Sequence, residues 1–97
     1  MSVNVLFEVQ SKPNKIKELK STLEIILSDT REYDGCMNVQ VIENQDDPYN
    51  LIIMELWKSR QHYETYLEWS TKKRDSKKLK GLIFQPPSVR FYNNLDT

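Results

Sequence analysis

The chain changes from one hydrophobic spacing to another near its start, and this change limits the available folds more than any other feature. Apolar residues occupy every second position of residues 2–10, which is the spacing of a β-strand. The residues on this predicted strand face are Val3, Val5, Phe7 and Val9. Between Pro13 and Gly35 the apolar residues recur at three- and four-residue steps, which indicates one face of a helix. Pro13 suits the first turn of that helix, and Gly35 suits the left-handed conformation at its end.

Two further strands are predicted in the middle of the chain. Residues 36–43 and 51–57 are rich in β-branched and other apolar residues. The segment NQDDPYN between them contains the Asn, Asp and Pro residues that favour turns. Such a short connection predicts that the two strands form an antiparallel hairpin.

A second helix and a last strand complete the pattern. Residues 59 to about 80 are predicted to be helical, with Ser59 as the N-cap and a break near Asp75-Ser76. Gly81 can cap the end of this helix, and the two prolines that follow prevent its continuation. Residues 88–93 return to a strand-like pattern.

The order strand, helix, strand, strand, helix, strand predicts an α+β fold of the ferredoxin-like, split βαβ type. The length of 97 residues fits a single domain, residues 1–97. Both helices should cover one face of the sheet and leave the other face open. We expect this open face to carry the alternating residues of the first strand together with Ile52, Met54 and Leu56, and a second copy of the chain to cover it. The predicted assembly is a homodimer.

Charge and cysteine content exclude several classes of partner. The 14 basic and 14 acidic residues balance, so no general attraction to nucleic acid or to a membrane surface is expected. No apolar run approaches the ~20 residues of a membrane span. The single cysteine, Cys36, cannot form an internal disulfide, which fits a reducing cytoplasm.

Metal and cofactor sites are not predicted. One histidine and one cysteine do not form a ligand set. The two glycines, Gly35 and Gly81, do not form a phosphate-binding loop. The basic residues between 72 and 80 are interpreted mainly as a solvated surface, with an anionic ligand as the less favoured alternative.

Three motifs resemble those of the antibiotic biosynthesis monooxygenase family. Arg31 to Cys36 is similar to its R-x-E-x-G-C turn, Glu55 to Ser59 to its E-x-W-x-S strand end, and Leu79 to Pro87 to its closing L-x-x-L-(x)-P-P pattern. The resemblance implies a dimeric α+β barrel of two ferredoxin-like subunits. It also implies a relation to quinol monooxygenases and anthrone oxygenases that use neither metal nor flavin.

The chain departs from the family pattern at several positions. Tyr66 occupies the place of the usual histidine, nine residues after Trp57, and Val39 stands where an aromatic residue is common. The haem-degrading branch of the same fold has tryptophan and histidine where this chain has Tyr66 and Ser76. The resemblance therefore points away from haem degradation.

The stretch HYETYLEWS concentrates the candidate site residues on the second helix. His62, Tyr66 and Trp69 share one helix face at i, i+4 and i+7, with Tyr63 and Leu67 beside them. Together with Trp57 at the strand end, these rings are expected to wall a flat aromatic pocket between helix and sheet. The alternative is that the same rings simply fill the core of a small domain.

The predicted function is oxidation of a small aromatic or quinol-like molecule by dioxygen without a cofactor. By resemblance Tyr63 lies at the substrate, and Tyr66 can donate a hydrogen bond in place of the family's histidine. His62 does not match the position of that histidine, but it is the default base because its ordinary pKa is near neutrality; the alternative is that it is a surface residue at the edge of the helix. The residues expected to contact the substrate are Trp57, Trp69, Ile53 and Leu67. The alternative is a non-enzymatic protein that binds a small ligand or acts in a stress response.

Overall fold

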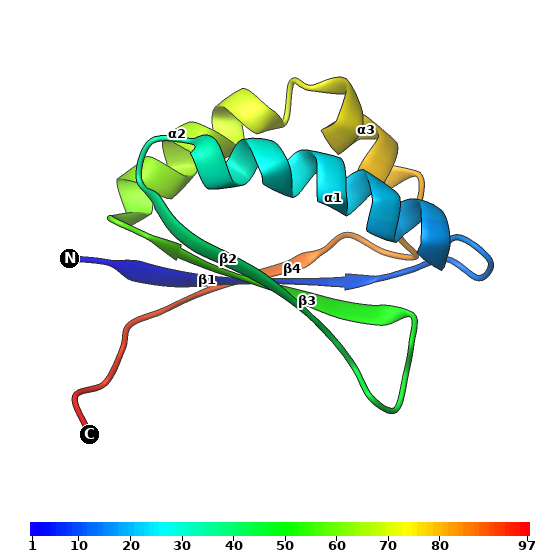
Figure 1. The fold of residues 1–97 in the computed structure, drawn as a ribbon, viewed down its shortest axis with the longest axis horizontal. Helices are drawn as coiled ribbons and strands as arrows, with labels where there is room; N and C mark the ends of the chain where they lie inside the picture. The colour runs from blue at the N-terminus through cyan, green and yellow to red at the C-terminus, as the bar shows by residue number, and fades with distance from the viewer.

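The computed structural model describes residues 1–97 and contains one four-stranded antiparallel sheet with three helices on one side (Figure 1). The elements are β1 (Val3–Gln10), α1 (Ile16–Glu32), β2 (Cys36–Glu43), β3 (Asn50–Trp57), α2 (Arg60–Ser70), α3 (Arg74–Lys80) and β4 (Ser88–Tyr92). The strand order is β2-β3-β1-β4, with β1 between β3 and β4. This arrangement confirms the predicted α+β ferredoxin-like fold, and the predicted β2–β3 hairpin is antiparallel.

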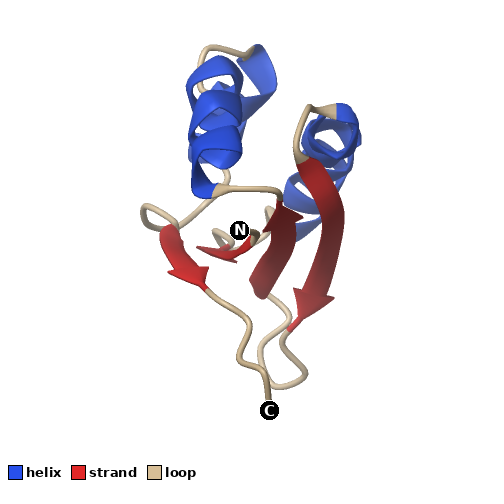
Figure 2. Cartoon of the chain, turned by 90° about the vertical axis from the view of Figure 1, so that its left-hand side faces the viewer, coloured by secondary structure: helices blue, strands red, loops and turns tan.

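The helices lie together above one face of the sheet, and no element covers the other face (Figure 2). Strand pairing decides which residues point to which side, because directly paired residues of neighbouring strands share a face. Val3 pairs with Trp57, and Val5 pairs with Glu55. The odd-numbered residues of β1 and β3 therefore face the helices together.

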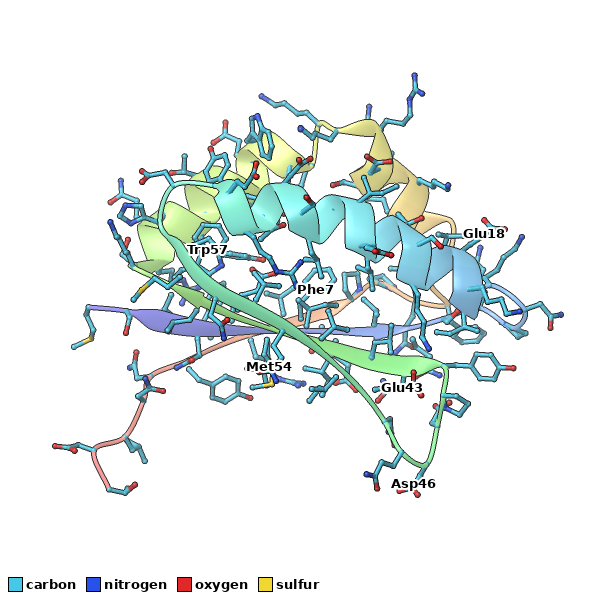
Figure 3. All side chains as sticks on the ribbon, viewed as in Figure 1. Phe7, Glu18, Glu43, Asp46, Met54 and Trp57 are labelled. Atoms are coloured by element: carbon cyan, nitrogen blue, oxygen red, sulfur yellow. The ribbon has the colours of Figure 1, made fainter.

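This register corrects the expectation for the first strand. Val3, Val5 and Val9 are buried under the helices rather than on the open face. Figure 3 shows Phe7 and Trp57 on the helix side of the sheet, and Met54 on the opposite side. Ile52, Met54 and Leu56 do face the open side, as predicted. The alternation showed that β1 has two faces, but it did not show which face meets the helices.

The core between sheet and helices has an aliphatic part and an aromatic part. The aliphatic part joins α1 to the sheet, and its buried residues are Val9, Leu19, Leu23, Leu27, Val39, Leu51, Ile53, Leu82 and Ile83. The aromatic part lies under α2 and contains Val3, Val5, Trp57, Tyr63 and Tyr66. The candidate site lies where these two parts meet.

The start of α1 differs from the prediction. Pro13 lies in a turn before the helix, which begins at Ile16 with Lys15 as its N-cap. Asn14 adopts a positive φ of 66°, a conformation that Asn tolerates better than most residues. The turn is closed by a hydrogen bond from the Lys15 N–H to the Lys12 carbonyl. Because this turn redirects the chain, the helix starts after Asn14 instead of at Pro13.

The second helical region is interrupted earlier than predicted. α2 ends at Ser70 and α3 begins at Arg74, so Asp75 lies in the first turn of α3 rather than in a break. An acidic residue in the first turn is favourable because it complements the positive end of the helix dipole. Two predicted caps are confirmed: Ser59 accepts a hydrogen bond from the His62 N–H, and Gly81 caps α3. None of the three helices has both the length and the apolar character needed to cross a membrane.

Candidate functional site

A cavity of about 240 Å³ lies between the helices and the sheet. Most of its 17 lining residues are hydrophobic, and they come from all three helices and from β1, β3 and β4. Four of the predicted site residues line it: Ile53, Tyr63, Tyr66 and Leu67. Exposed lining residues, including Leu67 on α2, Lys80 on α3 and Val89 on β4, mark the side on which it opens. The cavity is therefore an apolar pocket that opens between α2, α3 and β4.

Glu55 is the one carboxyl group that lines this cavity. Its side chain accepts a hydrogen bond of 2.8 Å from Trp57 Nε1, and this is its only hydrogen bond within the protein. No Lys, Arg or His side chain forms an ion pair with it. Burial raises the pKa of the Glu55 carboxyl, and the hydrogen bond from Trp57 opposes this rise. The carboxyl group thus has no charged partner in an apolar environment.

The second oxygen of Glu55 remains open to a ligand. Among residues that are not exposed, the only fully enclosed side-chain nitrogen or oxygen without a hydrogen bond partner is Arg90 Nε. Since Oε2 of Glu55 also has no partner but is not fully enclosed, it must contact accessible space. Glu55 lines the cavity, so we place this oxygen at the cavity surface.

The hydroxyl group of Tyr63 is also free to contact a ligand. The ring is buried and packs edge-to-face against Trp57 and Phe91, with centroid distances of 5.7 Å and 5.5 Å. Its hydroxyl forms no hydrogen bond within the protein and is not among the fully enclosed unpartnered atoms. Burial, and then the negative charge of Glu55, raise the pKa of Tyr63 far above its usual range. Tyr63 therefore stays neutral and can donate a hydrogen bond to a molecule in the cavity.

Tyr66 lines the cavity but its hydroxyl is already engaged. Its oxygen lies 2.6 Å from Thr30 Oγ1, and Thr30 Oγ1 lies 3.0 Å from the Ile26 carbonyl. Because that carbonyl can only accept, the Thr30 proton goes to Ile26, and the Tyr66 proton goes to Thr30. Burial raises the pKa of Tyr66, and the hydrogen bond with Thr30 opposes this effect. Tyr66 can thus accept a hydrogen bond from a ligand more readily than donate one.

Trp57 lies behind the cavity and does not line it. The side chain is fully buried, at 0% exposure. Its ring packs against Tyr66 at 5.1 Å, and its Nε1 donates to Glu55. Trp57 was expected to contact the substrate, but the structure places it where it orients Glu55 and supports the tyrosine rings.

His62 lies outside the cavity, at the surface end of α2. Its Nδ1 is 2.7 Å from Ser59 Oγ, and its Nε2 is 4.0 Å from Asp34 Oδ2. The ring lies against Gly35, where an added Cβ atom would be 2.5 Å from His62 Cδ2. The spacing predicted one face for His62, Tyr66 and Trp69, but only Tyr66 reaches the cavity, while His62 and Trp69 lie against the end of α1.

Trp69 is also outside the cavity. Its ring packs against Tyr33 at 4.9 Å, and Lys73 Nζ lies 3.9 Å from the ring centroid. The indole is 38% exposed and borders a separate, much smaller depression. The structure therefore brings together Ile53, Tyr63, Tyr66 and Leu67, and leaves the other three candidates outside.

Glu55 is the site residue that sequence reasoning missed. A signal was present, because Glu55 stands between Ile53 and Trp57 in a strand whose other inward positions are apolar. A charged residue at an inward-facing strand position is rare unless it is paired or functional. No group of three His, Cys, Asp or Glu side chains in the structure is arranged to hold a metal ion.

Comparison with solved structures identifies the same fold in other proteins. SnoaB, a cofactor-independent oxygenase from Streptomyces nogalater solved as a mutant, superposes with a TM-score of 0.86 at 10% identity, covering 99% of this chain and 95% of that one. The protein Rv0793 from Mycobacterium tuberculosis gives 0.81 at 22% identity, covering 100% and 98%. A conserved protein from Methanosarcina mazei gives 0.80 at 19% identity, covering 98% and 94%. At these identities the likeness shows a shared fold.

Sequence comparison establishes the family. No curated protein matches the chain. The sequence profile of the family described as antibiotic biosynthesis monooxygenase matches residues 2–70, which include β1, α1, the β2–β3 hairpin and α2. The matched segment carries Glu55, Tyr63 and Tyr66, and it covers more than half of the 97 residues. The chain therefore belongs to the antibiotic biosynthesis monooxygenase family.

Proposed function

We propose that the protein is a cofactor-independent monooxygenase that oxidises a small quinol-like aromatic molecule with dioxygen. Membership of the family supports a monooxygenase role. The observation that carries the proposal is an apolar cavity with unengaged polar groups on Glu55 and Tyr63. Apolar walls suit a planar ring, and the few polar groups suit its hydroxyl substituents.

The size of the cavity favours one or two rings. An apolar cavity of about 150 Å³ is known to hold benzene. At about 240 Å³, this cavity is larger but still falls below the usual range for drug-sized ligands. A hydroquinone or naphthohydroquinone fits this volume better than the three fused rings of an anthrone. We therefore infer that the substrate is a monocyclic or bicyclic hydroquinone.

The reaction uses electrons that the substrate itself supplies. Loss of the hydroxyl proton gives a phenolate, which transfers one electron to dioxygen; the resulting ring radical and superoxide then combine through a new C–O bond. Loss of water from this peroxide converts the ring C–H into a carbonyl, so a hydroquinone and dioxygen yield a hydroxyquinone and water. The protein needs to hold the ring, accept the proton and stabilise the oxyanion. Ile53 and Leu67 can hold the ring, and Tyr63 can donate to the oxyanion.

Oxygen uptake is the direct test. Chelator-treated protein with 1,4-naphthohydroquinone should consume dioxygen faster than the protein-free solution, and ¹⁸O₂ should place one labelled atom in the product. Leu67→Trp should abolish the difference because it fills the opening of the cavity. Ile25→Trp is the matched control, since Ile25 is 54% exposed on α1 and does not line the cavity. A protein that is inert after chelation and regains activity with iron would belong to a different class.

Ligand binding without turnover is the second candidate function. It is favoured by the engagement of Tyr66 with Thr30, which removes a hydrogen bond donor from the position of the family's usual histidine. In that case a quinone should quench the fluorescence of Trp57, which lies directly behind the cavity, while no oxygen is consumed.

We further propose that two copies of the chain pack through their open sheet faces. Met54 is exposed on this face, and Ile52 and Leu56 are half-buried beside it. Arg90 lies on the same face, and its enclosed Nε has no hydrogen bond partner within the chain. A second subunit would cover the apolar residues and could supply an acceptor for that nitrogen. An obligate interface of this type commonly buries more than ~2,000 Å².

A further inference from the structure

We propose that Glu55 is the catalytic base of the cavity, accepting the hydroxyl proton of the aromatic substrate on its free carboxylate oxygen. The inference deepens the proposed function and rests on it. It replaces His62, the base expected from ordinary pKa values, with a residue that lines the cavity.

The sheet register isolates the Glu55 carboxyl group from other polar groups. Its neighbours on the adjacent strands are Val5 and Val39, both buried on the same face. Its inward-facing neighbours along β3 are Ile53 and Trp57, and Trp57 Nε1 is the donor that bonds to it. Strand geometry thus aims a carboxyl group into an apolar pocket and leaves half of its hydrogen-bonding capacity unused.

Burying the Glu55 carboxyl group in this way lowers the stability of the fold, so stability does not explain its presence. An ionised carboxylate buried without a cation is costly, and evolution commonly avoids or pairs such groups. The charge of Glu55 raises the pKa of Tyr63 and Tyr66 on α2 and of the Cys36 thiol on β2, and none of these neighbouring groups is a cation that could pair with it. A ligand hydroxyl is therefore the partner that the pocket lacks. Burial also raises the pKa of Glu55, and a raised pKa makes a carboxylate a stronger base.

The other titratable groups near the cavity are less suitable as bases. His62 points away from it, and the Tyr66 hydroxyl already donates to Thr30. The pKa of Tyr63 and that of Cys36 are both raised, chiefly by burial, so these groups remain protonated. Lys80 lines the cavity at an exposed position, on the side where the cavity opens. Glu55 is the group that can carry a negative charge inside the pocket.

In the proposed step a proton moves from the substrate hydroxyl to Glu55. The substrate O–H bond breaks, its proton binds Oε2 of Glu55, and the electron pair stays on the phenolate oxygen. Tyr63 donates a hydrogen bond to that oxygen, and Trp57 Nε1 holds the other carboxyl oxygen in place. The phenolate then supplies electrons to dioxygen, and the proton leaves Glu55 when water departs from the peroxide.

Glu55→Gln separates proton transfer from ring binding, because the amide has nearly the shape of the carboxyl group but cannot accept the proton. With 1,4-naphthohydroquinone, kcat should fall about 100-fold or more, the usual contribution of a general base, while KM changes little. The acidic limb of the kcat–pH profile should disappear. Glu64→Gln is the matched control, because Glu64 is an exposed residue of α2 paired only with Arg60. Glu55→Gln with a wild-type kcat and an unchanged acidic limb would overturn the inference.

A binding measurement tests Glu55 independently of turnover and of the folding of the variant. At neutral pH the wild type should bind 1-naphthol about tenfold or more tightly than 1-methoxynaphthalene, which has no hydroxyl proton to donate. Equal binding of the two would overturn the role of Glu55. If the wild type and Tyr66→Phe, which lacks the other acceptor in the cavity, both show this preference but consume no oxygen with any hydroquinone, the proposed oxygenase function fails while the hydroxyl-binding role of Glu55 stands. If oxygen is consumed but Glu55→Gln retains full activity, the function stands and Glu55 is not the base.

Discussion

The hydrogen bond between Thr30 and Tyr66 allows the two cavity tyrosines to be separated by experiment. It is 2.6 Å long and joins the end of α1 to the middle of α2. Thr30 and Tyr66 are both buried, so water cannot replace either partner easily. Tyr63, one turn earlier on α2, forms no such bond. Removing one hydroxyl should therefore affect stability, and removing the other should affect function.

The expected magnitudes follow from these contacts. Tyr66→Phe loses one internal hydrogen bond and should lower the free energy of unfolding by about 0.5–1.5 kcal/mol. Thr30→Val leaves the Tyr66 hydroxyl without its acceptor and should lower it by about 1–3 kcal/mol. In the double variant neither group is left unpaired, so the combined loss should be smaller than the sum by about 1 kcal/mol. Each kcal/mol corresponds to about 4–8 °C in Tm for a domain of 60–100 residues.

Urea denaturation of the wild type, both single variants and the double variant measures this coupling as a double-mutant cycle. Tyr63→Phe is the matched control, because the same atom is removed where no partner is lost; its free energy of unfolding should change by less than about 0.5 kcal/mol. The activities should show the opposite order. Tyr63→Phe should lower kcat about 100-fold if its hydroxyl stabilises the oxyanion, whereas Tyr66→Phe should leave kcat nearly unchanged.

Two results would refute this reasoning. A coupling energy of zero would mean that Thr30 and Tyr66 do not share a hydrogen bond that matters for stability. A Tyr63→Phe variant that is as destabilised as Tyr66→Phe, with unchanged kcat, would mean that both rings act only as core packing. The cavity would then not be the site of the reaction.

Three further outcomes are expected. The folded-state pKa of Glu55 is raised above its ordinary value of 4.5, so protonation of Glu55 favours the folded state. The free energy of unfolding of the wild type relative to Glu55→Gln should therefore be highest below pH 4.5 and decline as pH rises through the folded-state pKa. Urea titrations at several pH values measure this difference. Gly35→Ala should lower the free energy of unfolding by at least about 1–2 kcal/mol in the same assay, because φ is +92° and the new Cβ would lie 2.6 Å from His62 Cβ, which no rotation of the ring relieves. Light scattering at micromolar concentration should show a dimer for the wild type and a monomer for Met54→Lys, and a folded wild-type monomer would reject the proposed interface.

Local spacing in the sequence predicted most of the fold. Strand and helix periodicity placed β2, β3 and β4 within a residue of their ends in the structure, and the order of the elements indicated the ferredoxin-like arrangement. This worked because hydrophobic spacing, the Ser59 cap and the turn residues act within a few positions along the chain. Two of the rings in residues 62–69, those of Tyr63 and Tyr66, line the cavity. The errors at Pro13 and near Asp75 arose where turn and helix signals overlap.

Tertiary structure decided which residues can meet a substrate. The face of β1 that meets the helices depends on its pairing with β3, and alternation in one strand carries no information about that pairing. The rotation of α2 depends on its packing against α1 and the sheet, and it turns Tyr63 and Tyr66 inward while His62 and Trp69 meet the end of α1. Glu55 lies in an apolar environment only because strand pairing places Val5 and Val39 on either side of it and the helices cover this face of the sheet. A carboxyl group has the same local sequence signal whether it faces water or a cavity, and only long-range packing creates the environment that changes its chemistry.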